Sequence, residues 1–74
     1  MATYRTTLVG RFDSGSIVEV HTDKTFYRVA ETSEEVTVIG PGVEEIYTIG
    51  EEIPRGLSIM AKALLAVLLW EDQL

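Results

Sequence analysis

Very few side chains in this sequence could do chemistry, and their types exclude the commonest kinds of protein centre. The 74-residue chain has no cysteine and one histidine, His21. Without thiols neither a disulfide nor a thiolate metal site can form, and one imidazole is too few for a conventional zinc site. The sequence therefore predicts no metal site and no cofactor.

The remaining candidates for acid–base catalysis are His21 and three pairs of adjacent glutamates. A general base needs a positioned partner and a pocket, whereas His21 falls in a strand-like stretch on the face expected to meet solvent. Adjacent strand residues point to opposite faces of a sheet, so Glu44 and Glu45 cannot converge on one bond. No nucleophile signature, phosphate loop or dinucleotide fingerprint is present. We therefore expect no catalytic residues and no enzyme activity.

The segment that best suits ligand binding is the expected entrance to a C-terminal helix, Arg55, Gly56, Leu57 and Ser58. Free backbone N–H groups, the helix dipole and the Arg55 guanidinium would meet there, and Gly56 would let a ligand approach the backbone. This combination suits a phosphate or a carboxylate. The alternative is a plain helix start capped by Ser58, and the two acidic residues just upstream would repel an anion unless turned away.

The charge of the chain argues against nucleic acid as a partner. Twelve carboxylates outnumber six basic residues, which gives a net charge of −6. Binding to phosphate backbones needs clustered Lys and Arg, whereas here they are scattered along the sequence. The carboxylates come in short pairs and form no long run, so mimicry of DNA has little support.

The longest apolar stretch, from Ile59 to Trp70, is interrupted by Lys62 and is shorter than the roughly twenty residues that cross a bilayer. The N-terminus has no apolar segment of the kind found in secretory signals. We expect a cytoplasmic protein that does not bind membranes.

The pattern along the chain predicts a single α+β domain over residues 1–74. Short stretches rich in Thr, aromatic and branched residues predict five strands. They cover residues 4–9, 17–22, 25–30, 36–39 and 43–49. The polar run 31–35 is expected to be a loop, and local connections favour an antiparallel meander. Pro54 suits a helix entrance, and strong helix formers from Leu57 to Trp70 predict one C-terminal helix packed on the sheet.

This helix is apolar on almost every side. At 100° per residue its apolar side chains fill an arc of roughly 220°, whereas packing on one sheet needs little more than about 100°. An apolar surface in excess of what one sheet covers favours an interface between copies of the chain. The interface is expected to include Ile59, Ala63, Leu65, Ala66, Leu69 and Trp70. The alternative is that the sheet curls around the helix and covers most of it.

Three pieces of the sequence form a recognisable series: the opening Tyr4-Arg5, the strand-like run 17–20 (Ile-Val-Glu-Val) and the Leu/Ala-rich run 63–69. In these pieces the chain resembles a group of small uncharacterised proteins of bacteria and their phages. In that group a β-meander leads through a Gly/Pro stretch into an apolar helix. Here Thr6 stands where the pattern favours Gly, and residues 51–56 replace its Gly-rich segment. The resemblance implies a phage-type accessory protein, a group that includes inhibitors and ligand sponges acting against host defence.

Together these features predict a non-enzymatic, homo-oligomeric binding protein, of the phage-type inhibitor or sponge kind, that acts by sequestration. Besides a second copy of itself, its partner would be a host protein or a phosphorylated small molecule held near Arg55 and Gly56. The alternative is a structural assembly module with no small-molecule ligand.

Overall fold

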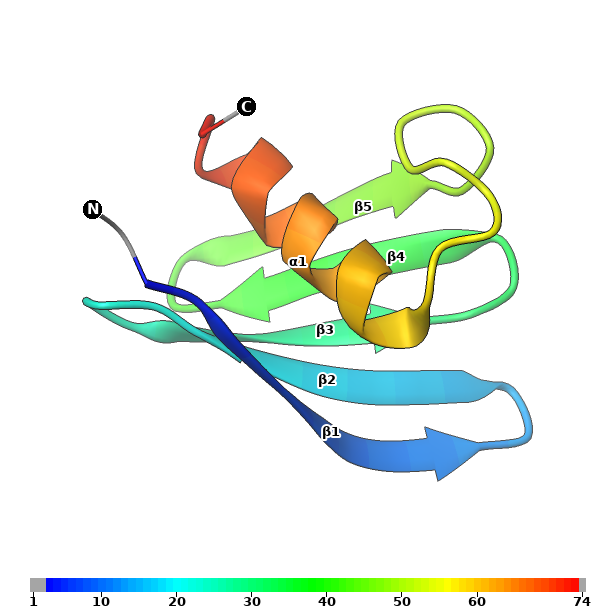
Figure 1. Cartoon of the computed structure of the whole chain (residues 1–74), viewed down its shortest axis with the longest axis horizontal. Helices are drawn as coiled ribbons and strands as arrows, with labels where there is room; N and C mark the ends of the chain where they lie inside the picture. The colour runs from blue at the N-terminus through cyan, green and yellow to red at the C-terminus, as the bar shows by residue number, and fades with distance from the viewer. Residues whose placement is uncertain (1–2, 74) are drawn as a thin grey trace.

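The computed structural model describes residues 3–73, which form one five-stranded sheet with one helix across one of its faces (Figure 1). The strands are β1 (Arg5–Phe12), β2 (Gly15–His21), β3 (Phe26–Glu31), β4 (Glu35–Gly40) and β5 (Val43–Thr48), and helix α1 covers Ile59–Trp70. Each strand pairs antiparallel with the next in sequence, so the order across the sheet is β1-β2-β3-β4-β5. The predicted α+β meander with a C-terminal helix is confirmed.

The three central strands form because branched or aromatic side chains occupy every second position: valines in β2 and β4, and Tyr27 and Val29 in β3. Strand periodicity places every second side chain on the same face, and branched side chains pack well on a pleated surface. The valines of this face are fully buried: Val18, Val20, Val29, Val36 and Val38. They pair across strands, Val18 opposite Val29 and Val29 opposite Val38, and so make a continuous apolar floor beneath the helix.

Helix α1 packs on this floor through its smallest side chains. It begins after Ser58, whose Oγ accepts a hydrogen bond from the Ala61 N–H at 3.1 Å. Ala63, Ala66 and Val67 are fully buried against the sheet, and the two alanines allow a close approach of helix to strands. The prediction that Ala63 and Ala66 contact another copy is therefore wrong, because the chain's own core encloses them.

The C-terminal end of α1 is attached to the sheet by a carboxylate that two tyrosines share. The Tyr4 and Tyr27 hydroxyls donate to the two oxygens of Glu71 at 2.8 and 2.9 Å. A smaller cavity of about 230 Å³ lies beside these three residues. Since the Glu71 carboxylate already has two donors, we assign it to holding the helix in place.

The strand predictions agree with the structure to within a few residues, with one important difference. The run 31–35 was expected to be a loop, but Glu31 is the last residue of β3 and lies opposite both Ser16 on β2 and Val36 on β4. Strand alternation therefore directs its side chain to the same face as Val29, under the helix. The loop prediction was wrong at Glu31 because the strand register continues through a charged residue.

The other face of the sheet carries no helix (Figure 1). Phe26, Ile39 and Ile46 are exposed on it. The His21 ring stacks on Phe26 with centroids 5.3 Å apart, and its Nε2 lies 3.0 Å from Glu19 Oε1. We refer to this surface as the open face.

Within residues 3–73, no helix has the length and apolar character that crossing a bilayer requires.

Candidate functional site

The β1–β2 turn and the β3–β4 turn lie at the end of the sheet nearest to the beginning of helix α1 (Figure 1). A cavity of about 360 Å³ is lined by residues of these two turns and by Ile59 and Lys62 from the first turn of α1. Four hydroxyl side chains line it: Ser14, Ser16, Thr32 and Ser33. Phe12 and Ile59 supply its apolar wall. We refer to this space as the Glu31 cavity, after one of the residues that line it.

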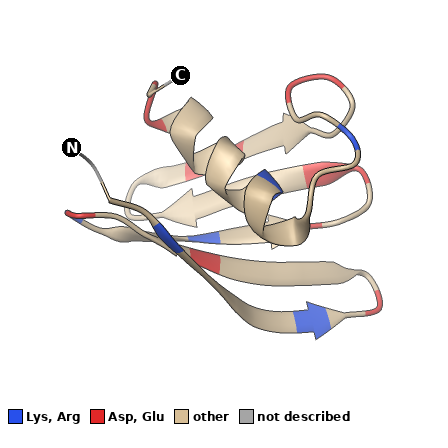
Figure 2. Ribbon diagram, viewed as in Figure 1, with Lys and Arg blue, Asp and Glu red and all other residues tan. Residues whose placement is uncertain are grey.

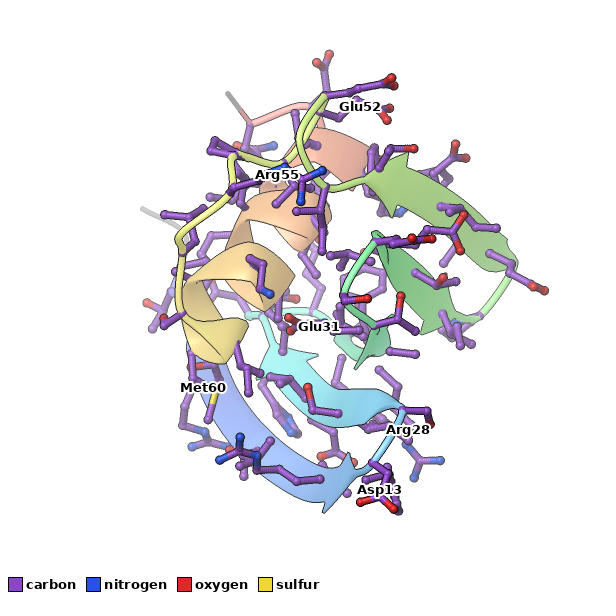
Figure 3. All side chains as sticks on the ribbon, turned by 90° about the vertical axis from the view of Figure 1, so that its right-hand side faces the viewer. Asp13, Arg28, Glu31, Glu52, Arg55 and Met60 are labelled. Carbon is purple, nitrogen blue, oxygen red and sulfur yellow. The ribbon has the colours of Figure 1, made fainter. Side chains whose placement is uncertain are left out.

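Glu31 is the most unusual residue of the chain, because it is a carboxylate buried without a hydrogen-bond donor. Its side chain rises from the sheet toward the first turns of the helix (Figure 3). Only 3% of the residue is exposed, and neither carboxylate oxygen has a hydrogen-bond partner among the described residues. Buried carboxylates are normally hydrogen-bonded, and an unpaired one in a native protein calls for a functional or structural explanation.

Lys62 is the charged group nearest to this carboxylate. Its Nζ lies 3.6 Å from Glu31 Oε1, which is an ion pair too long for a hydrogen bond. The Lys62 side chain is itself mostly buried, and it lines the cavity together with Glu31. The cavity wall therefore holds a carboxylate and an ammonium group that lie close together but form no hydrogen bond with each other.

Burial dominates the electrostatics of the pair. Loss of hydration raises the pKa of the Glu31 carboxyl from 4.5 to about 7, and Lys62 opposes this rise without cancelling it. Glu31 therefore changes its charge close to neutral pH. When it is protonated, the charged side chains lining the cavity are Arg11, Lys62 and Asp13, with one net positive charge.

This local charge contrasts with the rest of the chain. Figure 2 shows that Lys and Arg are distributed over sheet, loops and helix and form no basic patch on the ribbon. The Glu31 cavity brings together two of the six basic residues of an acidic protein.

Gly15 makes this arrangement of strands possible. A Cβ at position 15 would collide with the backbone carbonyl oxygen of Glu31, so only glycine lets the start of β2 approach the end of β3 so closely. The sequence pattern Asp13-Ser14-Gly15 predicts a turn but gives no sign of this contact.

Replacing Gly15 with Ala should therefore destabilise the protein by about 2 kcal/mol, because the β2–β3 pairing beside Glu31 must open to admit a methyl group. Urea denaturation measures this change. Gly42→Ala is the control: its Cβ would meet no atom within 4 Å, and only the positive φ of 73° opposes it, at a cost of about 1 kcal/mol. Equal stability of Gly15→Ala and wild type would contradict the tight contact.

The predicted anion site at the helix entrance lies elsewhere. Arg55, Gly56, Leu57 and Ser58 are all exposed, and none of them lines the Glu31 cavity. Figure 3 shows Arg55 in the loop that leads to the helix, away from Glu31. The Ser58 hydroxyl is used as the helix N-cap. The structure thus brings these four residues into no enclosed space.

The predicted interface residues of the helix are less exposed than their apolar pattern indicates. Ile59, Leu65 and Leu69 are partly buried and pack against the chain's own core, and among the predicted set only Trp70, at 39%, is exposed. The most exposed large apolar side chains lie on the sheet instead. They include Val9, Phe12, Phe26, Ile39 and Ile46.

No group of three or more potential metal-binding side chains occurs in the part of the chain that the structure describes. Comparisons with protein-family models, with curated proteins and with solved structures found no match. The chemistry of the Glu31 cavity therefore rests on its own residues.

Sequence reasoning missed both Glu31 and Lys62. A signal for each was present: Tyr27, Val29 and Glu31 continue one period-two pattern, and Lys62 is the one charged residue within the run 59–70.

Proposed function

We propose that the chain is a non-enzymatic binding protein that holds a small phosphorylated ligand in the Glu31 cavity. The observation that carries this proposal is the position of Lys62, an ammonium group in the cavity wall whose nearest charged partner lies 3.6 Å away and forms no hydrogen bond with it. A phosphate oxygen can supply the charge-assisted hydrogen bond that Lys62 lacks with Glu31.

The remaining cavity walls fit the same kind of ligand. Arg11 offers a second cation, and the hydroxyls of the two turns can donate to phosphate or sugar oxygens. The beginning of α1 adds the positive end of the helix dipole nearby. A volume of about 360 Å³ is within the range of small-molecule sites.

Binding without turnover follows from the same inventory. Two carboxyl groups, Asp13 and Glu31, line the cavity together with the Lys62 amine and the Arg11 guanidinium, without an imidazole or a thiol. Attack on a phosphate ester needs an activated nucleophile or a metal-activated water, together with groups that stabilise the charge of the transition state. Capture of a ligand without changing it is the action of a sponge, which is the kind of protein that the resemblance implies.

Isothermal titration calorimetry with ribose 5-phosphate and a nucleoside 5′-monophosphate tests the proposal, with ribose and the nucleoside as unphosphorylated controls. We expect heat and thermal stabilisation from the phosphorylated compounds alone, since a ligand at about a hundred times its Kd adds about 2.7 kcal/mol to stability. Lys62→Gln should weaken binding at least tenfold, whereas Lys24→Gln, on an exposed turn, should not. Absence of binding by every phosphorylated compound would reject the function.

Association of the chain with a second copy is a second candidate, supported by the apolar side chains of the open face rather than by the helix. Arg28, Ile39 and Glu44 lie side by side on β3, β4 and β5, so two open faces related by a two-fold axis could pair Arg28 with Glu44 around Ile39. Burial of exposed Phe26, Ile39 and Ile46 would drive the contact.

Size-exclusion chromatography with light scattering tests this association. We expect a dimer of the 8.2 kDa chain at micromolar concentration, and Ile39→Glu should convert it to a monomer. Ala61→Glu, on the helix side, is the matched control and should leave the dimer intact. A monomeric wild type would exclude the dimer.

A further inference from the structure

We infer that the phosphorylated ligand enters the Glu31 cavity together with a proton, which Glu31 holds in its carboxylic acid form while donating it in a hydrogen bond to a phosphate oxygen. The inference rests on the proposed function and assigns Glu31 the part of a specificity-determining residue. It predicts that the site selects a doubly charged phosphate monoester under conditions where Glu31 can be protonated.

The geometry leaves little alternative for an anion that reaches Lys62. Glu31 Oε1 lies 3.6 Å from Lys62 Nζ, so a phosphate oxygen hydrogen-bonded to this ammonium group comes close to the carboxylate. Two negative groups at such a distance repel each other, and burial of the Glu31 oxygens limits how far water can screen this repulsion. If Glu31 carries a proton, the same contact becomes a hydrogen bond between a carboxylic acid and an oxyanion.

Among the carboxyl groups that line the cavity, Glu31 is the one that lies beside Lys62. From α1, Lys62 faces the carboxylate; from β1 and the turn after it, Arg11 and Asp13 line the same cavity. The neighbours of Glu31 across the sheet are Ser16 and Val36. Both Glu31 oxygens are without a donor, so protonation of either one breaks no existing hydrogen bond.

Protonation also changes the charge balance of the cavity in favour of an anion. With Glu31 ionised, Arg11 and Lys62 are cancelled by Asp13 and Glu31, whereas with Glu31 neutral one positive charge remains. Burial already raises the pKa of Glu31 to about 7, so the proton is added at little cost near neutral pH. The proton comes from solvent, and no bond of the ligand is broken.

Calorimetry of ribose 5-phosphate binding at pH 8, in two buffers with different heats of ionisation, tests the inference. At this pH the ligand is a dianion, because the second pKa of a phosphate monoester is about 6. Each binding event should therefore take up close to one proton from the buffer, and the affinity should fall by nearly tenfold between pH 7.5 and 8.5.

Glu31→Gln shows whether Glu31, rather than another group, takes up the proton. The amide donates a hydrogen bond permanently, so this variant should still bind ribose 5-phosphate, with no proton uptake and no such fall in affinity. Glu35→Gln, on the neighbouring strand and exposed, should behave as wild type. Binding to wild type without proton uptake, or uptake that persists in Glu31→Gln, would overturn the inference while leaving the proposed function standing. Failure of all phosphorylated compounds to bind wild type would remove the proposed function and this inference together.

Discussion

The wild-type protein should become more stable by about 2–3 kcal/mol through Glu31 alone when the pH falls from 8 to 5. The folded state holds the Glu31 proton up to about pH 7, whereas the unfolded chain releases it near pH 4.5. Between these two values the folded state binds more protons than the unfolded state. Its stability therefore falls as the pH rises through this window, by about 1.4 kcal/mol for each unit of pKa difference.

Urea denaturation of wild type and Glu31→Gln at pH 5 and pH 8 measures this effect. The change in unfolding free energy between the two pH values is determined for each protein, and the contribution of the other carboxylates cancels when one change is subtracted from the other. Glu31→Gln should lack the 2–3 kcal/mol contribution, since glutamine does not titrate. Glu35→Gln should retain it, because that carboxylate is exposed. Identical pH dependence of wild type and Glu31→Gln would show that the Glu31 carboxyl is not held in a costly environment.

Lys62→Met should destabilise the protein by about 2 kcal/mol at pH 8, because without its partner Glu31 takes up a proton, which costs about 1.4 kcal/mol for each pH unit above its wild-type pKa of about 7. Methionine keeps most of the apolar contact of the lysine side chain, so the cost comes from the uncompensated charge on Glu31. At pH 5 Glu31 is protonated, and the same substitution should cost about 1 kcal/mol or less.

A charge effect is identified by the difference between the losses of stability that Lys62→Met causes at pH 8 and at pH 5, rather than by the size of either loss. Lys24→Met, on the exposed β2–β3 turn, should change stability by about 0.5 kcal/mol or less at both. The double variant Glu31→Gln/Lys62→Met should be far less sensitive to pH than Lys62→Met, because no buried charge remains. An equal cost of Lys62→Met at pH 5 and pH 8 would mean that packing, not charge, explains the role of Lys62.

The fold was largely predictable because its signals are local. Alternating valines in β2 and β4, and Tyr27 and Val29 in β3, set the strands. Gly and Pro set the turns, and Ser58 followed by strong helix formers sets the start of α1. Each of these patterns acts over a few residues. A single sequence is therefore enough to recover the order and approximate limits of the elements.

The site was not predictable by the same reasoning, because its contacts are long-range. Glu31 looks like the first residue of an acidic loop, and only the pairing with Ser16 and Val36 turns its side chain under the helix. Lys62 looks like the one solvated position of an apolar helix, and only the docking of α1 brings it to Glu31. A charge in the otherwise apolar run of a helix is the kind of departure from pattern that marks a functional or strained position.

The expected excess of apolar surface on the helix was an overestimate for a physical reason. The count over helix positions treated the sheet as covering one narrow stripe, whereas Ile59, Leu65 and Leu69 all pack partly against the core. The sheet also has two faces, and Phe26, Ile39 and Ile46 are exposed on the face that no helix covers. Periodicity gives the apolar face of a strand but not which face a helix will cover.

The most direct test of this account is a titration of the Glu31 side-chain carboxyl by carbon-13 NMR on the folded protein, with Glu31→Gln used to assign the signal. Buried beside Lys62 without a hydrogen-bond donor, this carboxyl should titrate with a pKa of about 7. A midpoint near 4.5, where an unperturbed glutamate titrates, would contradict the buried environment and, with it, the proton-linked ligand site.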